Sequence, residues 1–156
     1  MNKKDLYRPN VAMVIVSKEY PAKKEVFLAQ RNDLADIWQF PQGGIDEGED
    51  ALEALFRELE EEIGTNMVEV IAEYPEWISY DFPPRIAETM KPFIGQKQRY
   101  FLVKLHEEAQ IDIETQHPEF REYKFVAPND ILSLSASFKK DVYESVINYF
   151  ISKGLL

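Results

Sequence analysis

An amphipathic segment from about Asp50 to Ile63 constrains the fold more than any other part of this chain. Its apolar residues recur at the spacing of one helix face, and Gly64 follows as a helix-ending residue. A helix with one apolar face must bury that face against another layer of the protein. We therefore predict a helix that packs along one side through Leu52, Leu55, Phe56, Leu59 and Ile63.

The other side of this segment is acidic. Glu58, Glu61 and Glu62 stand at positions i, i+3 and i+4, so they share one patch on a helix. Like charges at this spacing destabilise a helix by about 0.2–0.5 kcal/mol per pair, and a bound Mg²⁺ or Mn²⁺ would reverse that sign. Arg57 precedes Glu61 by four residues and can hold its carboxylate. The alternative is an ordinary solvated acidic face, which is what most charge runs are.

The acidity of the chain is concentrated here. The formal net charge is -10 over 156 residues. Residues 46–62 contain nine acids and one base, a net of -8, which leaves only -2 for the rest. This balance argues against DNA or a long RNA groove as the partner, although the remaining bases suffice to guide a short 5′ end. A chelated divalent cation would offset part of the charge.

Length and composition favour one soluble domain over residues 1–156. There is no cysteine, so disulfides and thiolate metal sites are excluded. No apolar run is long enough to span a membrane, and the first residues lack the apolar region of a signal peptide. We expect a cytoplasmic monomer with no membrane partner.

Several short segments rich in β-branched and aromatic residues predict strands. A second helix is expected near residues 137–153, and residues 77–85 are expected to form a strand that runs into a proline-marked loop. Strands interspersed with helices predict a single α/β or α+β sandwich. The expected strands are residues 11–17, 25–31, 67–74, 98–105 and 122–126, with a short apolar run at 38–40.

The spacing of glycine, glutamate and arginine around the helix resembles the Nudix box, Gly-x5-Glu-x7-Arg-Glu-U-x-Glu-Glu-x-Gly-U, where U is a bulky aliphatic residue. The match covers residues 43–65 and departs from the pattern only at Thr65, which stands where an aliphatic residue is usual. That departure concerns packing at the helix end. The matching residues are Gly43, Glu49, Arg57, Glu58, Leu59, Glu61, Glu62 and Gly64.

This resemblance implies an α/β/α sandwich with a mixed sheet, and hydrolysis of a nucleoside diphosphate linked to another moiety. It implies that Glu58, Glu61 and Glu62 bind divalent metals, assisted by a backbone carbonyl of the Gly43 loop. Glu49 and Arg57 would fix the loop and helix, with Arg57 orienting a metal-binding glutamate. Metal ions would neutralise the phosphate oxygens and activate the attacking water.

The flanking segments resemble one branch of the family, which contains bacterial RNA 5′-pyrophosphohydrolases and dinucleoside polyphosphate hydrolases. In that branch Glu119 corresponds to a further metal ligand or candidate base, although a Pro-Glu-Phe turn is by itself only a turn. The segments that carry the resemblance are residues 7–11 (YRPNV), 38–46 (WQFPQGGID), 95–102 (GQKQRYFL), 118–120 (PEF) and 137–143 (SFKKDVY).

The same resemblance assigns substrate-binding roles outside the box. An aromatic ring next to a cation suits a base and its phosphate. Without the resemblance, Phe138 is equally well a core residue at a helix start, Lys97 a solvated strand edge and Arg8 an isolated surface arginine. The residues expected to bind substrate are Arg8, Arg31, Tyr80, Lys97, Phe138 and Lys139.

Three hypotheses follow. The first is an RNA pyrophosphohydrolase that converts 5′-tri- or diphosphorylated RNA ends to 5′-monophosphate and so promotes mRNA decay, using two or three Mg²⁺ (or Mn²⁺) ions. The second is a dinucleoside polyphosphate hydrolase that splits diadenosine tetraphosphate. The third is a non-catalytic nucleotide- or metal-binding module, against which the intact glutamate set speaks. The identity of the general base stays open among the glutamates.

Overall fold

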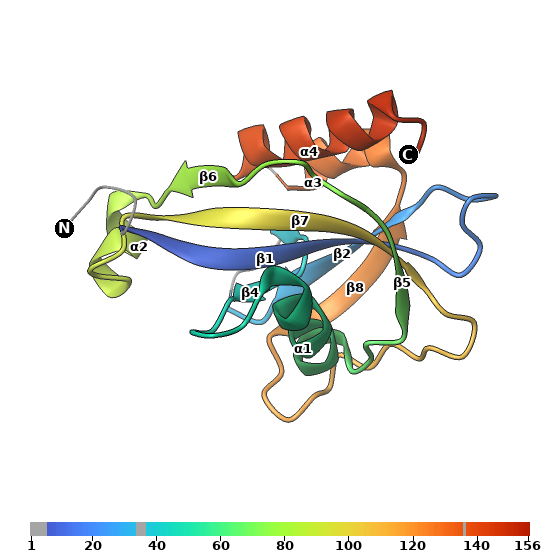
Figure 1. Ribbon diagram of the computed structural model, residues 1–156, viewed down its shortest axis with the longest axis horizontal. Coiled ribbons are helices and arrows are strands. Elements are labelled where there is room, and N and C mark those ends of the chain that lie inside the picture. The colour runs from blue at the N-terminus through green and yellow to red at the C-terminus, as the bar shows by residue number, and fades with distance from the viewer. Residues whose placement is uncertain (1–5, 34–36, 136) are drawn as a thin grey trace.

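A computed structural model describes residues 6–33, 37–135 and 137–156. It contains a mixed eight-stranded sheet with helices on both faces. Figure 1 shows α4 on one side of the sheet and α1 on the other. The strands are β1 (Tyr7–Val16), β2 (Val26–Arg31), β3 (Trp38–Gln39), β4 (Gln42–Gly44), β5 (Val68–Glu73), β6 (Ile78–Asp81), β7 (Gly95–Leu105) and β8 (Phe120–Val126). The helices are α1 (Ala51–Ile63), α2 (Pro84–Thr89), α3 (Ile131–Leu134) and α4 (Lys140–Ser152), and a 3₁₀ turn covers Pro128–Asp130.

The centre of the sheet is a long parallel pair. Strand β1 runs alongside β7 in continuous register from Tyr7↔Gly95 to Val16↔Lys104. The main path of the sheet is β3-β2-β1-β7-β5, and the shorter strands attach beside it: β4 pairs with β1, β6 with β7, and β8 with β2. Every pairing other than β1–β7 is antiparallel. The predicted sandwich with a mixed sheet is confirmed.

Alternate residues of β1 point to opposite faces, as the two-residue period of a strand requires. Ala12, Val14 and Val16 join the core beneath α4, whereas the odd-numbered residues join the core beneath α1. β1 is buried on both faces and therefore reads as a continuous apolar run rather than an alternating one. The residues under α1 are Val11, Met13 and Ile15.

Helix α1 confirms the main prediction from the sequence. Asp50 and Glu53 form a reciprocal capping box at its start, and Gly64 adopts the left-handed conformation (φ 77°) at its end. Leu55, Leu59 and Ile63 are fully buried in the core. Leu52 is an exception, because it is 46% exposed and borders an open pocket instead of the core.

Other element boundaries differ from the predictions for local reasons. β1 and β7 each begin earlier than predicted, at Tyr7 and Gly95, because each supplies the other with parallel hydrogen bonds from its first residue. Residues 84–89 form the short helix α2, which begins at Pro84 after the capping residue Pro83, where only a loop was expected. Across residues 6–33, 37–135 and 137–156, no helix has the length and apolar character needed to cross a bilayer.

Candidate active site

Arg57 organises the acidic end of the molecule. Its Nε and Nη2 donate to the two carboxylate oxygens of Glu49, both at 2.8 Å. Nη2 also donates to the carbonyl oxygen of Gly44 at 2.8 Å, while Nη1 donates to Glu58 at 2.9 Å and to Glu61 at 3.2 Å. One guanidinium thus ties the glycine loop to helix α1 through charge-assisted hydrogen bonds.

This arrangement keeps Glu49 ionised. The Arg57 guanidinium, together with the backbone N–H of Asp46, lowers the pKa of the Glu49 carboxyl to about 2. In turn the pKa of Arg57 is raised, first by Glu49 and then by Glu58. Glu49 therefore acts as a permanent anchor for the loop, as the resemblance implied, and its carboxylate is occupied by Arg57.

Glu58 and Glu62 have the opposite electrostatics. Burial raises the pKa of the Glu58 carboxyl to about 7, with Arg57 opposing part of that effect. Burial also raises the pKa of Glu62 well above its usual value, and the negative charges of Glu119 and Glu58 raise it further. Since Glu119 acts on both carboxyls, the turn before β8 brings it beside the helix. Glu61 shares the Arg57 Nη1 donor with Glu58, so the four predicted glutamate ligands are neighbours.

Gly43 leaves space for this cluster. A Cβ atom at this position would collide with the carboxylate of Glu58, so only glycine lets the β4 backbone approach the helix so closely. This close approach is a matter of space and involves no left-handed backbone at Gly43. The carbonyl group expected to assist a metal is therefore held on the same strand as the close contact.

The chemistry of these side chains fits a hard divalent cation. Glu62 Oε2 is buried and has no hydrogen-bond partner among the described residues, although buried oxygens are normally paired. Within the described ranges no three acidic or histidine side chains already converge as a finished metal site. Glu58 and Glu61 point to Arg57, and Glu61 is largely exposed. A cation would supply the charge that this all-oxygen set lacks.

A second group of predicted residues meets on the α4 side of the sheet. The rings of Tyr80 and Phe138 lie with their centroids 5.5 Å apart. The Lys139 ammonium lies 5.7 Å from the Tyr80 centroid and 5.8 Å from that of Phe138. Lys139 is only 6% exposed, and its burial, with Arg31 nearby, lowers its pKa to about 8. The group offers two rings and a buried cation.

An amide network joins the two groups. Lys139 Nζ donates to Gln42 Oε1 at 3.1 Å, and Gln98 Nε2 donates to the same oxygen at 2.9 Å. Gln98 also donates to Asn10 Oδ1 at 2.9 Å and accepts from the Tyr100 hydroxyl at 2.9 Å. The next residue, Gly43, lies directly against the Glu58 carboxylate. Strand β4 therefore contacts both groups, through Gln42 on the aromatic side and Gly43 on the carboxylate side.

Sequence reasoning missed Gln42, Gln98 and Asn10. The sequence offered one weak signal, because Gln96 and Gln98 alternate with Lys97 and Arg99 directly ahead of an apolar run, as residues on the two faces of a strand do. In the structure Gln98 is fully buried. A buried amide must find partners, so polar residues within a central strand point to a network. Gln42 gave no such signal, since it precedes the glycine pair in what reads as a loop.

Of the other residues predicted to bind substrate, Arg8 and Arg31 influence Tyr80, whereas Lys97 lies elsewhere. Burial raises the pKa of Tyr80 to about 12, and Gln42, followed by the positive charges of Arg8 and Arg31, partly opposes that rise. Arg31 also forms a two-point pair with Asp33, at 2.8 and 2.5 Å. Lys97 is not brought into this group. Its ammonium lies over the ring of Trp77, 5.3 Å from the centroid.

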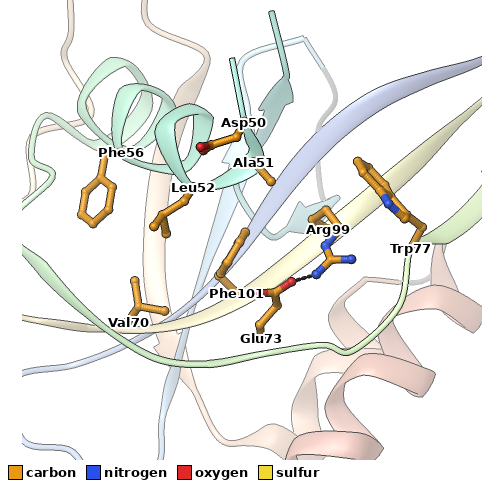
Figure 2. A pocket seen from close by; sticks show the side chains of 9 residues that line it. All are labelled: Asp50, Ala51, Leu52, Phe56, Val70, Glu73, Trp77, Arg99 and Phe101. Atoms are coloured by element: carbon orange, nitrogen blue, oxygen red, sulfur yellow. Dashed lines mark ion pairs between the residues drawn. The ribbon is translucent and has the colours of Figure 1, made fainter. Parts of the chain in front are cut away.

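Trp77 borders a separate open pocket of about 500 Å³, shown in Figure 2. The pocket lies between the start of α1 and the strands β5 and β7. None of the predicted site residues lines it. Its lining consists of Asp50, Ala51, Leu52, Phe56, Val70, Glu73, Trp77, Arg99 and Phe101.

Comparison with known proteins decides the family. Residues 6–146 match the model of the NUDIX domain. The chain belongs to the Nudix family. Like other members of this family, it is expected to work with a divalent metal ion such as Mg²⁺.

Individual Nudix proteins resemble this chain over most of its length. A protein named RNA pyrophosphohydrolase from Nitratiruptor is 56% identical over 151 residues, covering 97% of each chain. Another of the same name from Sulfurovum is 54% identical over 157 residues and covers both chains completely. The crystal structure of an Ap4A hydrolase binary complex from C. elegans has a TM-score of 0.69 at 20% identity, covering 94% of this chain and 98% of its own, and so shows the shared fold.

Proposed function

We propose that this Nudix protein is an RNA pyrophosphohydrolase that converts 5′-tri- or diphosphorylated RNA ends to 5′-monophosphate and thereby promotes RNA decay. The observation that carries the proposal is the contact of strand β4 with both halves of the site: Gly43 lies against the Glu58 carboxylate, and Gln42 accepts a hydrogen bond from the buried Lys139 ammonium. Identity of 54–56% to proteins named RNA pyrophosphohydrolase, over nearly the whole chain, supports it.

The carboxylate group is the proposed metal site. Glu58, Glu61, Glu62 and Glu119, with the backbone carbonyl of Gly43, would hold two or three Mg²⁺ ions, or Mn²⁺ in their place. Bound there, the ions supply charge neutralisation of the phosphate oxygens and activation of water. Arg57 positions Glu58 and Glu61 through its Nη1 donors and keeps the loop closed on the helix.

The other group is the proposed nucleotide site. The cations Arg8, Arg31 and Lys139 neutralise the phosphate chain, while Tyr80 and Phe138 offer faces on which a base stacks. Water oxygen attacks a phosphorus of the 5′ chain, the anhydride P–O bond breaks, and the leaving pyrophosphate or orthophosphate keeps the electron pair. A carboxylate of the group, Glu119 included, accepts the proton of the water.

The alternative substrate is a dinucleoside polyphosphate such as diadenosine tetraphosphate. The same cations and rings would serve it, because both substrates present a base next to a polyphosphate. The fold is shared with an Ap4A hydrolase at 20% identity. We place it second because the relatives with much higher identity carry the other name.

One substrate panel tests the proposal. Triphosphorylated RNA, diphosphorylated RNA, diadenosine tetraphosphate and free nucleoside triphosphates are incubated with the purified protein and Mg²⁺, and phosphate and pyrophosphate release are measured. Conversion of RNA to 5′-monophosphate ends at the highest kcat/KM is expected. Cleavage of the dinucleotide alone would overturn the RNA assignment in favour of the second candidate. No activity on any substrate would favour a binding module.

Paired variants on α1 control the panel. Glu62→Gln is expected to lower kcat by about 100-fold or more, since it removes a charge on which the metal site depends. Glu60→Gln is the matched control, because Glu60 is on the same helix, exposed, and outside the carboxylate group. The proposed enzyme is a cytoplasmic monomer that does not take DNA, which sizing chromatography and a DNA arm of the panel address.

A further inference from the structure

Trp77 is a large aromatic side chain that the fold leaves exposed. Its relative exposure is 46%, although tryptophan is highly buried on average. Lys97 Nζ lies 5.3 Å and Arg99 Cζ 5.5 Å from its ring centroid. Figure 2 shows Trp77 and Arg99 together at one end of the open pocket. Two cations on one exposed ring call for an explanation other than core packing.

The two cations beside Trp77 differ in whether an acidic side chain neutralises them. Arg99 pairs with Glu73 across the sheet edge, which offsets its charge. Lys97 has no ion-pair partner within residues 6–33, 37–135 and 137–156, so its charge is free to attract an anion. On a chain with net charge -10, an uncompensated cation beside an exposed ring is a distinct local feature. Proteins that bind single-stranded nucleic acid use this combination, in which a base stacks on the aromatic ring and the cation neutralises a phosphate.

Strand register places this surface close to the carboxylate group. Val11 of β1 pairs with Gly43 of β4 on one side and with Arg99 of β7 on the other. Gly43 and Arg99 are thus two strand spacings apart, about 10 Å. A fully stacked strand rises about 3.4 Å per nucleotide, so three nucleotides or fewer span that distance.

The strands that carry Trp77 and Lys97 also connect this surface to the nucleotide group. Ser79 of β6 pairs with Lys97 of β7, and the next residue, Tyr80, pairs with Gln96. Tyr80 points to the nucleotide group under α4, whereas Lys97 points to the other face, because side chains alternate along a strand. An RNA chain that leaves the site around this sheet edge therefore meets Trp77 and Lys97.

We propose that Trp77, Lys97 and Arg99 form a platform for the RNA body, binding a nucleotide a few positions downstream of the 5′ phosphates. The inference rests on the proposed function, since it needs a polynucleotide substrate. A base stacks on the free face of Trp77, and Lys97 neutralises a neighbouring phosphate. The platform serves affinity for long transcripts and takes no part in bond breaking.

Chain length is the variable that tests the platform. KM and kcat are measured for a 5′-triphosphorylated dinucleotide and for a triphosphorylated 12-mer, with wild type and Trp77→Ala. We expect Trp77→Ala to raise KM for the 12-mer about 5-fold or more, with kcat unchanged, and to leave KM for the dinucleotide unaltered. Trp77→Phe retains a ring and should recover most of the affinity. Equal effects on both lengths, or none on either, would overturn the proposal.

Charge gives a second variable. Lys97→Gln should reduce the salt dependence of 12-mer binding, lowering the slope of log K against log salt by about 0.7. Lys104→Gln is the matched control, because Lys104 lies on the same strand β7 but at its far end. A slope that falls equally in both variants would contradict a specific role for Lys97.

Direct binding separates this inference from the proposed function. A 5′-hydroxyl 12-mer labelled at its 3′ end is titrated without Mg²⁺, and its anisotropy is recorded. Binding by wild type that Trp77→Ala weakens, in the absence of any hydrolysis of triphosphorylated RNA, would refute the activity and support the platform. Hydrolysis of triphosphorylated RNA together with 12-mer binding that Trp77→Ala does not weaken would support the activity and refute the platform. The exposed surface would then be assigned to a protein partner. Thermal melting of Trp77→Ala checks that the variant is folded.

Discussion

The Lys139 ammonium donates to Gln42 Oε1 at 3.1 Å, joining residues that are 97 positions apart in the chain. Lys139 stands at the start of α4, and Gln42 opens the strand that continues into the glycine pair. The contact fixes a buried cation relative to the backbone that approaches Glu58. A phosphate chain held by Lys139 is thereby placed relative to the carboxylates.

Replacement of Gln42 should therefore affect catalysis more than stability. Gln42→Leu keeps similar bulk but removes the acceptor shared by Lys139 and Gln98. Hydrogen bonds to charged groups contribute about 1.5–3 kcal/mol, so we expect kcat/KM to fall about 10- to 100-fold. Steady-state kinetics on triphosphorylated RNA measures the change. The double variant with Lys139→Met should lose little more than either single variant, and full additivity would show that the two residues act independently.

Metal-free stability should fall as the pH rises. Glu58 has a folded-state pKa of about 7 against an ordinary 4.5, and Glu62 is raised as well, so the folded state holds protons that the unfolded state releases. The stability present in full below about pH 4.5 is therefore lost progressively as the pH rises through 7. Melting in EDTA should give a higher Tm at pH 5.5 than at pH 7.5.

The same experiment has two internal checks. Glu62→Gln should flatten the pH dependence and raise the metal-free Tm at pH 7.5, because a neutral amide replaces a buried carboxylate. Mg²⁺ should raise the wild-type Tm at pH 7.5 by binding the folded state, and should raise that of Glu62→Gln less. A wild-type Tm that climbs between pH 5.5 and 7.5 without metal would contradict the proposed electrostatics.

Gly43→Ala tests the close approach of β4 to the helix. The added methyl group would meet the Glu58 carboxylate and push either the side chain or the strand aside. We expect activity to fall about 100-fold, as for other displacements within a catalytic group. Gly48→Ala is a useful comparison, since its Cβ would meet no atom within 4 Å although its φ of 81° disfavours alanine. If Gly43→Ala matched Gly48→Ala in kcat, space at Gly43 would be unimportant.

Arg57→Lys tests the fork of hydrogen bonds. Lysine keeps the charge but cannot bond Glu49 at two points and also reach Gly44 and Glu58. We expect a fall in kcat of about 10- to 100-fold, with KM changed less, because the carboxylates are misplaced while the nucleotide group is intact. Glu49→Gln should cause a smaller loss. Kinetics that show a KM effect alone would mean that Arg57 acts on substrate rather than on the carboxylates.

Much of the fold was accessible from the sequence because local signals agreed with one another. The capping residue Asp50, the apolar stripe and Gly64 define α1 almost to the residue. The buried strands β1 and β2 read as apolar runs. Local patterns could not give the length of β1 and β7, since their first residues are polar and gain their structure only from each other. The same holds for β4, whose pairing with β1 is a long-range contact.

The sequence predicted which residues form the site better than it predicted the hydrogen bonds between them. The acidic spacing pointed to a cation, and the side chains at 80, 138 and 139 do gather. The hydrogen bond from Lys139 to Gln42 could not be foreseen, because it depends on how α4 folds back across the sheet. Lys97 shows the same limit: a one-residue difference in strand position sets which face a side chain occupies, and here it faces Trp77.

The central strand pair β1 and β7 separates the residues proposed to bind metal from those proposed to bind a base. Carboxylates gather on the α1 face, and rings that suit a base gather on the α4 face, with the three-residue strand β4 in contact with both. A substitution on the α4 face can therefore change which molecule is bound while the structure of helix α1 stays the same. Because the backbone of β1 and β7 lies between them, the carboxylates and the residues that contact a base can be substituted separately.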